Sequence, residues 1–268
     1  MTLVLGGTGT TGRRLVRLLR ARGVEVRAAS RSGDVRFDWS DRETWEPALA
    51  GVDRMYLMAP HETPIDEAFV RLAVERGVRR IVLLSSRGIE EMGDERLLSA
   101  ERTVRDSGAG WTILRADWFN QNFDEGFFRP AVLAGSLALP IGDTRQAFVD
   151  ADDIASVAAV ALTEDGHEGR TYEVTGPQPL SFAEALSMVS HASGRPVRFG
   201  GEEDDYLAQQ RALGASDDET RGALAAFAGL RAAGDAEATD VVREVTGRDP
   251  KSFADYTAEA AAGPAWRD

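Results

Sequence analysis

The sequence predicts an α/β fold, with a doubly wound parallel sheet and a smaller, mostly helical C-terminal lobe. In the first half of the chain, short β-branched runs alternate with amphipathic segments of helical length, the pattern of βαβ units around a parallel sheet. A turn rich in glycine separates the first run from the first amphipathic segment. Beyond about residue 150 helical patterns dominate, so the second half is expected to pack on the first as a lobe.

The elements of the first half follow from residue type and spacing. Leu15, Leu18 and Leu19 share one face of the first helix, because residues three and four apart are neighbours on a helix surface. The crossovers between parallel strands are expected to be right-handed. The predicted strands cover residues 2–5, 24–29, 35–37, 54–58, 79–84 and 111–115. The predicted helices cover residues 12–22, 42–50, 64–76 and 95–107.

The second half contains one predicted strand among helices. A helix over residues 150–162 opens with an acidic cluster, which suits the positive end of a helix dipole. A strand over residues 169–175 is ended by a Gly-Pro pair. Ser181 and Glu184 form a capping box. The helical patterns that follow cover residues 181–193, 203–213, 217–233 and 237–246.

Composition excludes several kinds of site and partner. The 268 residues include no cysteine, which excludes disulfide, Cys-zinc and thiol chemistry. The three histidines are scattered, so no metal site is expected. The net charge of −13 arises from residues 131–268, and such a surface repels nucleic acid and anionic lipid. No apolar run approaches the ~18 residues of a membrane span and no basic segment precedes the first apolar run, so a cytoplasmic protein is expected.

The glycine-rich turn indicates a dinucleotide site. Gly6, Gly9 and Gly12 form a G-x-x-G-x-x-G motif directly between the first strand and the first helix. Glycines at such positions allow a tight turn, close approach of backbone to a pyrophosphate, and close packing of helix on strand. The free amides at the helix N-terminus then face the anion.

The end of the second strand favours NADP over NAD. An NAD site usually carries an acidic residue about 20 positions beyond the glycines, where it binds the ribose. Here Arg31 stands at that place, and residues 26–30 before it include no acid. A guanidinium group suits a 2′-phosphate. The alternative is that Arg31 is a solvated loop residue.

With these features in order, the chain resembles the NmrA-like branch of the atypical short-chain dehydrogenases/reductases over nearly its whole length. The resemblance implies a Rossmann-type sheet that binds NAD(P), with the substrate held against the nicotinamide by the C-terminal lobe. The motifs that carry it are the glycine loop, Arg31, RIVLLSS at 80–86, Glu101, WTILRADWFxxNF at 111–123, FVDxxDIA at 148–155, YxxTGP at 172–177 and TGRxPxSF at 246–253.

The resemblance also implies which residues contact the cofactor, in addition to the three glycines and Arg31. For one of these, Trp39, core packing is an equal alternative. The implied contacts are Thr10 and Thr11 beside the pyrophosphate, Asp38 and Trp39 beside the adenine, Met58, Ala59 and Pro60 along the ribose side, and Ser85 at the nicotinamide end.

The usual proton-transfer pair of the superfamily is absent. Orthodox members use Tyr-x-x-x-Lys, in which the tyrosine donates a proton to the substrate carbonyl. Counted back from Glu101, Leu97 takes the place of the lysine and Gly93 that of the tyrosine. The catalytic residues are therefore left unassigned, and any proton must come from another group, from the substrate or from water.

The substrate is expected to meet residues at the nicotinamide end. Trp118 and Phe119 could stack on a planar substrate; alternatively, these two and Phe123 are core residues under the lobe. The substrate-binding candidates are Ser86, Leu97, Trp118, Phe119 and Asn122. Further polar candidates are Arg87, Asp117, Asn120 and Gln121.

Two functions fit these features. The first is an NADPH-dependent reductase that delivers hydride to an electron-poor small molecule such as a quinone, enone or imine, because the cofactor carries the difficult chemistry. The second is a non-catalytic NADP sensor that binds a protein partner. In either case residues 1–150 are expected to form the dinucleotide-binding domain. Within residues 151–268, one strand and one helix return to the sheet and the rest forms the substrate lobe.

Overall fold

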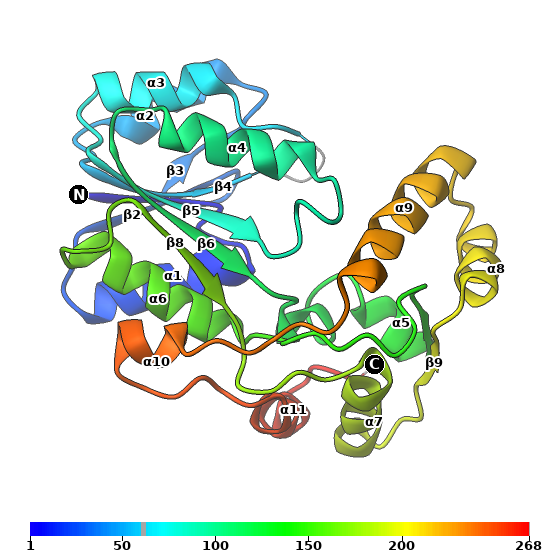
Figure 1. Ribbon diagram of the computed structural model, residues 1–268. Helices are drawn as coiled ribbons and strands as arrows, with labels where there is room; N and C mark the ends of the chain where they lie inside the picture. The colour runs from blue at the N-terminus through cyan, green and yellow to red at the C-terminus, as the bar shows by residue number, and fades with distance from the viewer. Residues whose placement is uncertain (60–62, 268) are drawn as a thin grey trace.

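The computed structural model describes residues 1–59 and 63–267 and contains one parallel sheet with helices on both faces (Figure 1). The strand order is β3-β2-β1-β4-β5-β6-β8. After β3 the chain returns to place β4 beside β1, and this reversal of direction is where doubly wound sheets bind ligands. The strands are β1 (Thr2–Leu5), β2 (Val26–Ser30), β3 (Val35–Arg36), β4 (Arg54–Met58), β5 (Arg80–Ser86), β6 (Gly110–Ala116) and β8 (Arg170–Val174).

Each face of the sheet has its own apolar core. One core lies under α2 (Trp45–Leu49), α3 (Glu67–Glu75) and α4 (Glu95–Arg105). The other lies under α1 (Thr10–Ala21), α6 (Ala151–Thr163) and α10 (Val241–Thr246). The predicted doubly wound α/β fold is therefore confirmed, and both β8 and α6 from the second half belong to this sheet layer.

Several helices and strands begin or end at other residues than expected, for local reasons. The first helix begins at Thr10, because Gly9 caps it in an extended conformation. The second strand begins at Val26, since Val24 still donates to the Leu19 carbonyl in the turn that closes α1. Strand β5, expected to end at residue 84, continues to Ser86, because Ser85 and Ser86 pair with β6. The helix expected over residues 42–50 is a 3₁₀ turn followed by the short α2.

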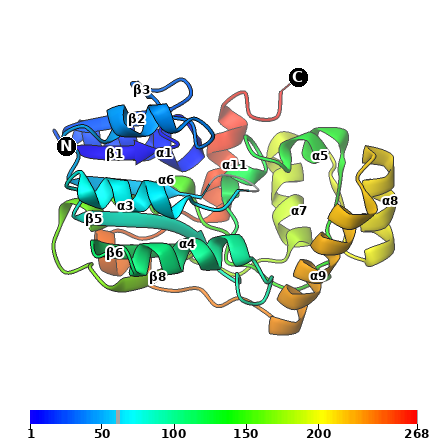
Figure 2. The same ribbon diagram turned by 90° about the horizontal axis from the view of Figure 1, so that it is seen from above.

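A lobe packs beyond the carboxyl ends of the strands (Figure 2). Its core is aromatic, with Phe123, Phe148, Phe182 and Phe253 in edge-to-face or tilted contact. Its chain begins before residue 150, since Phe123 and Phe128 belong to the same cluster. The lobe elements are α5 (Arg129–Ala134), β7 (Ser136–Ala138), α7 (Phe182–Ser193), β9 (Arg198–Gly200), α8 (Glu203–Leu213), α9 (Asp217–Ala233) and α11 (Phe253–Ala262).

The helix expected over residues 237–246 is wrong in its first part, because only Val241–Thr246 is helical. Residues 234–240, called here the 234–240 segment, leave α9 at Gly234 and run without regular structure over the ends of the sheet strands. Thr239 donates its amide to the Thr175 hydroxyl (2.8 Å) and its own hydroxyl to the Glu173 carbonyl (2.6 Å). These side-chain bonds replace the helical ones.

Two features of the lobe had no counterpart in the expected elements. Strands β7 and β9 form a separate two-stranded parallel sheet. Helix α11 begins at Phe253, and the preceding Ser252 caps it by accepting from the Asp255 amide. Among the described residues, no helix is both long and apolar enough to cross a membrane.

Candidate functional site

The glycine loop is shaped by close packing of backbone on backbone. Gly6 has a left-handed backbone (φ 64°), and a Cβ there would collide with the Met58 sulfur. A Cβ at Gly12 would collide with the Gly6 carbonyl. These two glycines are therefore required by the protein itself.

Gly9 is less confined than the other two glycines of the motif. A Cβ at this position would meet the Gly6 carbonyl at 3.2 Å, a tight contact but not the collision found at Gly6 and Gly12. In the region that the structure describes, the amides of Thr10, Thr11 and Gly12 at the start of α1 donate to no protein acceptor. Free amides beside a glycine fit the pyrophosphate of a dinucleotide. The Thr11 side chain is not free, since the buried Tyr56 hydroxyl donates to it (3.0 Å).

The end of β2 presents hydroxyl groups and one cation. Thr8 donates to the Ser30 hydroxyl (3.0 Å), which also accepts the Ser32 amide (3.1 Å). Arg31 is exposed and makes no hydrogen bond or ion pair with any described residue. Asp34 is the nearest acid along the chain, and its carboxylate accepts from the Ala28 amide and from Arg20.

Asp38 and Trp39 are held by local contacts. The Asp38 carboxylate accepts from both the amide and the hydroxyl of Ser40. Trp39 is half-buried and packs edge to face against Phe37 and Phe69, with ring centroids 5.1 Å apart in each pair. This packing is the alternative that the sequence left open for Trp39, and the structure places the ring in the aromatic cluster of the core.

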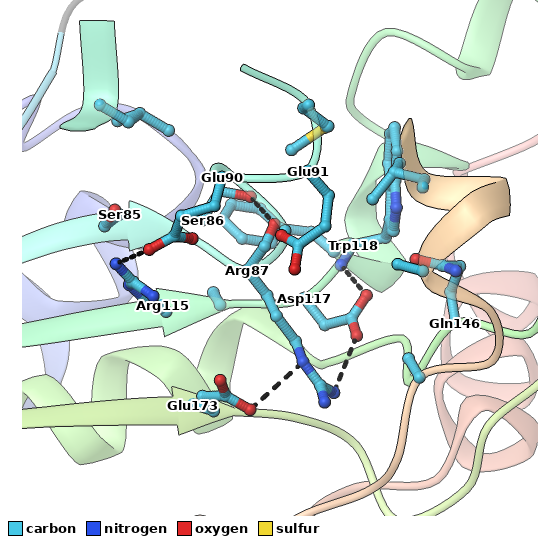
Figure 3. A pocket seen from close by; sticks show the side chains of 18 of the residues that line it. Ser85, Ser86, Arg87, Glu90, Glu91, Arg115, Asp117, Trp118, Gln146 and Glu173 are labelled. Atoms are coloured by element: carbon cyan, nitrogen blue, oxygen red, sulfur yellow. Dashed lines mark hydrogen bonds and ion pairs between the residues drawn. The ribbon is translucent and has the colours of Figure 1, made fainter. Parts of the chain in front are cut away.

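A cavity of about 650 Å³ lies at the carboxyl ends of β5 and β6, between the sheet and α9 (Figure 3). Met58 and Ala59 line one end and connect the cavity with the glycine loop, while Pro60 lies outside the described residues. The lining residues predicted from the sequence are Met58, Ala59, Ser85, Ser86, Arg87, Leu97, Asp117, Trp118, Phe119 and Asn122.

A buried carboxylate that the sequence did not identify as functional fixes the floor of this cavity. Glu101 has no exposed surface and accepts from the Ser85 hydroxyl (2.7 Å) and from Arg115 (2.8 Å to each oxygen). Arg105 donates to it as well (2.9 Å). Burial opposes ionisation, but the bonds from Arg115 and Ser85 and the two positive charges outweigh it and lower the pKa of Glu101. The one signal in the sequence was the i, i+4 pair of Glu101 with Arg105.

The two positions at which the superfamily carries its proton-transfer pair hold no polar side chain. Leu97 lines the cavity and is 7% exposed. Gly93 has a left-handed backbone (φ 63°) and no side chain to offer. Neither position can donate a proton.

Asp117 and Arg87 link the strand ends. Asp117 is 5% exposed and accepts from the Trp118 amide (2.7 Å) and the Ala147 amide (3.2 Å). Its burial raises its pKa. The Arg87 guanidinium lies 3.6 Å from Asp117 and 3.3 Å from Glu173, and donates to the Glu237 carbonyl (2.6 Å) (Figure 3). Arg87 thus ties β5, β6 and β8 to the 234–240 segment.

Aromatic rings form one wall. Trp118 stacks near parallel with Phe128 (centroids 5.7 Å apart) and with Phe227 from α9 (6.4 Å). Phe127 also lines the cavity and is 65% exposed. Trp118 and Phe119 each pack on a core cluster and also line the cavity, so both interpretations of these rings hold in part.

Two of the polar residues considered near the substrate, Asn120 and Gln121, are buried away from the cavity. Phe123 is fully buried in the lobe core, as its core interpretation expected. Gln121 donates to Asp150 (2.9 Å) and accepts from the Ala151 amide (2.8 Å), so it fastens the start of α6. Asn120 has no exposed surface and does not line the cavity.

Comparison with known proteins assigns the family. A family model described as NAD(P)H-binding matches residues 6–165, more than half of the chain. The protein belongs to this family. This confirms the NmrA-like resemblance and the nicotinamide dinucleotide as the kind of cofactor.

Similar proteins extend the match to nearly the whole chain. Prestalk A differentiation protein A of Dictyostelium discoideum is 32% identical over 277 residues, covering 96% of this chain and 91% of its own. A (4-alkanoyl-5-oxo-2,5-dihydrofuran-3-yl)methyl phosphate reductase of Streptomyces griseus is 35% identical over 288 residues, covering 97% and 98%. An NADPH-dependent quinone oxidoreductase from Escherichia coli, solved with NADPH, shares the fold with a TM-score of 0.75 at 22% identity, covering 97% and 99%.

Proposed function

We propose that this protein is an NADPH-dependent reductase that transfers hydride to an electron-poor small molecule such as a quinone, enone or imine, without the Tyr-x-x-x-Lys pair. The observation that carries the proposal is a large cavity, walled by aromatic rings, at the strand ends where the glycine loop would deliver the nicotinamide. The reductase from Streptomyces griseus and the quinone oxidoreductase from Escherichia coli agree with this chemistry.

The residues divide the work between binding and positioning. The amides at the start of α1, next to Gly6 and Gly9, would hold the pyrophosphate, and Met58 and Ala59 would border the ribose. NADPH supplies the hydride when bound. Ser85, fixed by Glu101, faces the cavity floor, while Leu97 and Trp118 shape the space for the acceptor. In this proposal residues 1–150 supply most cofactor contacts and the lobe closes the substrate side.

NADPH is proposed as the preferred cofactor because of the end of β2. Arg31 makes no hydrogen bond or ion pair with a described residue. Ser30 precedes it in the chain, and the Thr8 hydroxyl donates to the Ser30 hydroxyl. A guanidinium and hydroxyl groups suit a 2′-phosphate, whereas the ribose-binding acid of an NAD site is missing.

Steady-state oxidation of NADPH against a panel of quinones, enones and imines tests the proposal. Turnover with at least one of these acceptor classes is expected, and NADPH is expected to support it better than NADH. The hydride step should depend little on pH between about 6 and 9, because Leu97 and Gly93 carry no titrating group. NADPH binding with no turnover against the whole panel would overturn the reductase and favour the NADP sensor with a protein partner.

A further inference from the structure

The charged side chains around the cavity are mostly acidic. Among the described lining residues there are five acids and three arginines: Glu90, Glu91, Asp117, Glu173 and Asp235 against Arg87, Arg96 and Arg115. A cavity with one prevailing sign of charge and apolar walls concentrates ligands of the opposite sign. The charges that are not neutralised within the protein therefore determine which charge on a substrate the cavity favours.

The arginines are all engaged by acids. Arg115 binds Glu101 through two of its nitrogens and binds Glu90 at 2.7 Å. Arg87 lies between Asp117 and Glu173. Arg96 pairs with Asp94 at 3.1 Å. Their positive charge is thus largely neutralised before any substrate binds.

Two of the acids keep their charge available. Glu91 is exposed and forms no hydrogen bond or ion pair with any other described residue. Asp235, at the start of the 234–240 segment, is exposed and accepts only the Arg145 backbone amide (2.8 Å). Glu91 comes from the turn after β5 (Figure 3) and Asp235 from the segment after α9, so these two acids reach the cavity from separate parts of the chain.

The aromatic wall adds to the same preference. Trp118, Phe119 and Phe127 line the cavity, and the Trp118 ring is held in place by its stacking on Phe128 and Phe227. The face of an aromatic ring attracts a cation through its quadrupole. Phe127, which is 65% exposed, is the most accessible of these rings, because Trp118 already stacks on its two neighbours. Aromatic faces together with unpaired carboxylates form a site for a flat, positively charged molecule.

We propose that the cavity selects a planar cationic substrate, a conjugated iminium or quaternised aromatic nitrogen compound, with Glu91 and Asp235 as the selecting charges. The inference rests on the proposed reductase function and names its substrate class. Addition of hydride from NADPH to the carbon of a C=N⁺ group forms a C–H bond and moves the π electron pair onto nitrogen. The products are a neutral amine and NADP⁺, and no proton is required, in keeping with Leu97 and Gly93.

Calorimetric binding in the presence of NADP⁺ tests the charge preference without turnover. Three two-ring probes of similar shape differ in charge at pH 8: 1-methylquinolinium is a cation, quinoline is neutral and 1-naphthoate is an anion. The cation is expected to bind at least about tenfold more tightly than quinoline, and 1-naphthoate more weakly than either. Equal binding of all three probes, or tightest binding of the anion, would overturn the proposal.

A double variant and a matched control test which charges produce the preference for the cation. The double variant Glu91→Gln/Asp235→Asn is expected to weaken binding of 1-methylquinolinium about five- to tenfold and to leave quinoline unchanged. Glu164→Gln removes an exposed acid at the far end of α6 and should change neither. A cation preference that survives in the double variant would show that these two acids do not select the substrate.

Turnover separates this inference from the reductase proposal. If NADPH reduces neutral quinones with the same kcat/KM as cationic acceptors, the reductase stands and the charge preference fails. If the cation binds tightly but no acceptor is reduced, the charged site stands and the reductase fails.

Discussion

Single residues of the glycine loop have different tasks, although all three follow one motif. Gly6 and Gly12 are needed by the protein, because a Cβ would collide with Met58 or with the Gly6 carbonyl. Gly9 is less constrained, since a Cβ there would meet the Gly6 carbonyl at 3.2 Å without colliding with it. Substitutions at Gly9 and Gly12 should therefore separate loss of binding from loss of fold.

Gly9→Asp is expected to abolish dinucleotide binding in a folded protein, because its carboxylate would lie where the free amides of α1 attract a phosphate. Gly9→Ala should retain measurable binding, and it should lower the free energy of unfolding less than Gly12→Ala does, because the added Cβ meets the Gly6 carbonyl at 3.2 Å at Gly9 and at 2.1 Å at Gly12. Calorimetric titration with NADPH, with thermal unfolding as the fold check, measures all three. Unchanged NADPH affinity in folded Gly9→Asp would exclude the loop as the cofactor site.

Arg31→Ala is expected to weaken NADPH binding about ten- to a hundredfold, the usual worth of a hydrogen bond to a charged group. NADH affinity and stability should stay the same, because Arg31 has no partner among the described residues. Parallel titrations with both cofactors give the answer. Equal losses for NADPH and NADH would show that Arg31 does not recognise the 2′-phosphate.

Glu101→Gln is expected to lower the free energy of unfolding by about 3–5 kcal/mol at pH 7, because it leaves Arg115 and Arg105 without their buried counter-charge. The pKa of Glu101 is lowered in the folded state, so its contribution is present above the unfolded pKa and is lost as pH falls through the folded pKa. Urea unfolding from pH 7 to pH 3 should therefore show the two proteins converging in acid. A constant difference across this range would contradict the assignment.

At the scale of elements, close contacts at two glycines hold α9 against the turn after β5. A Cβ at Gly229 would collide with the Glu91 carbonyl, and one at Gly88 would press on Leu230 at 2.8 Å. Leu230, next to Gly229, and Ala233, one helical turn further on, line the cavity. The position of α9, and with it the cavity wall, depends on this close approach.

Gly229→Ala is expected to push α9 from the turn at Glu91, to raise KM for the acceptor several-fold and to lower stability. Gly222→Ala is the matched control in the same helix, where nothing lies within 4 Å of the added Cβ. It should stabilise the protein by up to about 1 kcal/mol, the usual gain of alanine over glycine in a helix. Thermal unfolding measures the stability of both variants, and steady-state kinetics measures their KM for the acceptor. Equal effects of the two changes would show that α9 does not rest on Gly229.

At the scale of the whole molecule, buried charges hold the C-terminal segment to the sheet layer. Asp153, 1% exposed at the start of α6, pairs with Arg248 (2.7 Å) and accepts the Lys251 amide (2.8 Å). Its burial raises its pKa, so the partners are needed to keep the carboxylate charged. The chain passes from α10 on the sheet to α11 in the lobe through these residues.

Arg248→Ala is expected to lower the free energy of unfolding by about 1.5–3 kcal/mol, because it leaves a buried carboxylate short of a charged donor. Arg243→Ala removes an exposed arginine of α10 whose partners Asp240 and Asp249 are also exposed, so it should lower the free energy of unfolding much less than Arg248→Ala. Urea unfolding should keep a single transition in the parent and in both variants, since the lobe core and the sheet share this junction. Two separate transitions in the parent would contradict that coupling.

The sequence alone determined the α/β class, the strand order along the chain, the glycine loop and the family, because these depend on local periodicity and on residues next to one another. It also identified ten of the residues that line the cavity. It could not show that Glu101 fixes Ser85 and Arg115, since those residues meet only when β5, β6 and α4 are packed together. Nor could it show that Gly229 seats α9, or that residues 234–240 exchange helical bonds for side-chain bonds at the strand ends. Contacts between distant segments have no local signature, so only the tertiary structure decided which charges around the cavity are paired and which remain free.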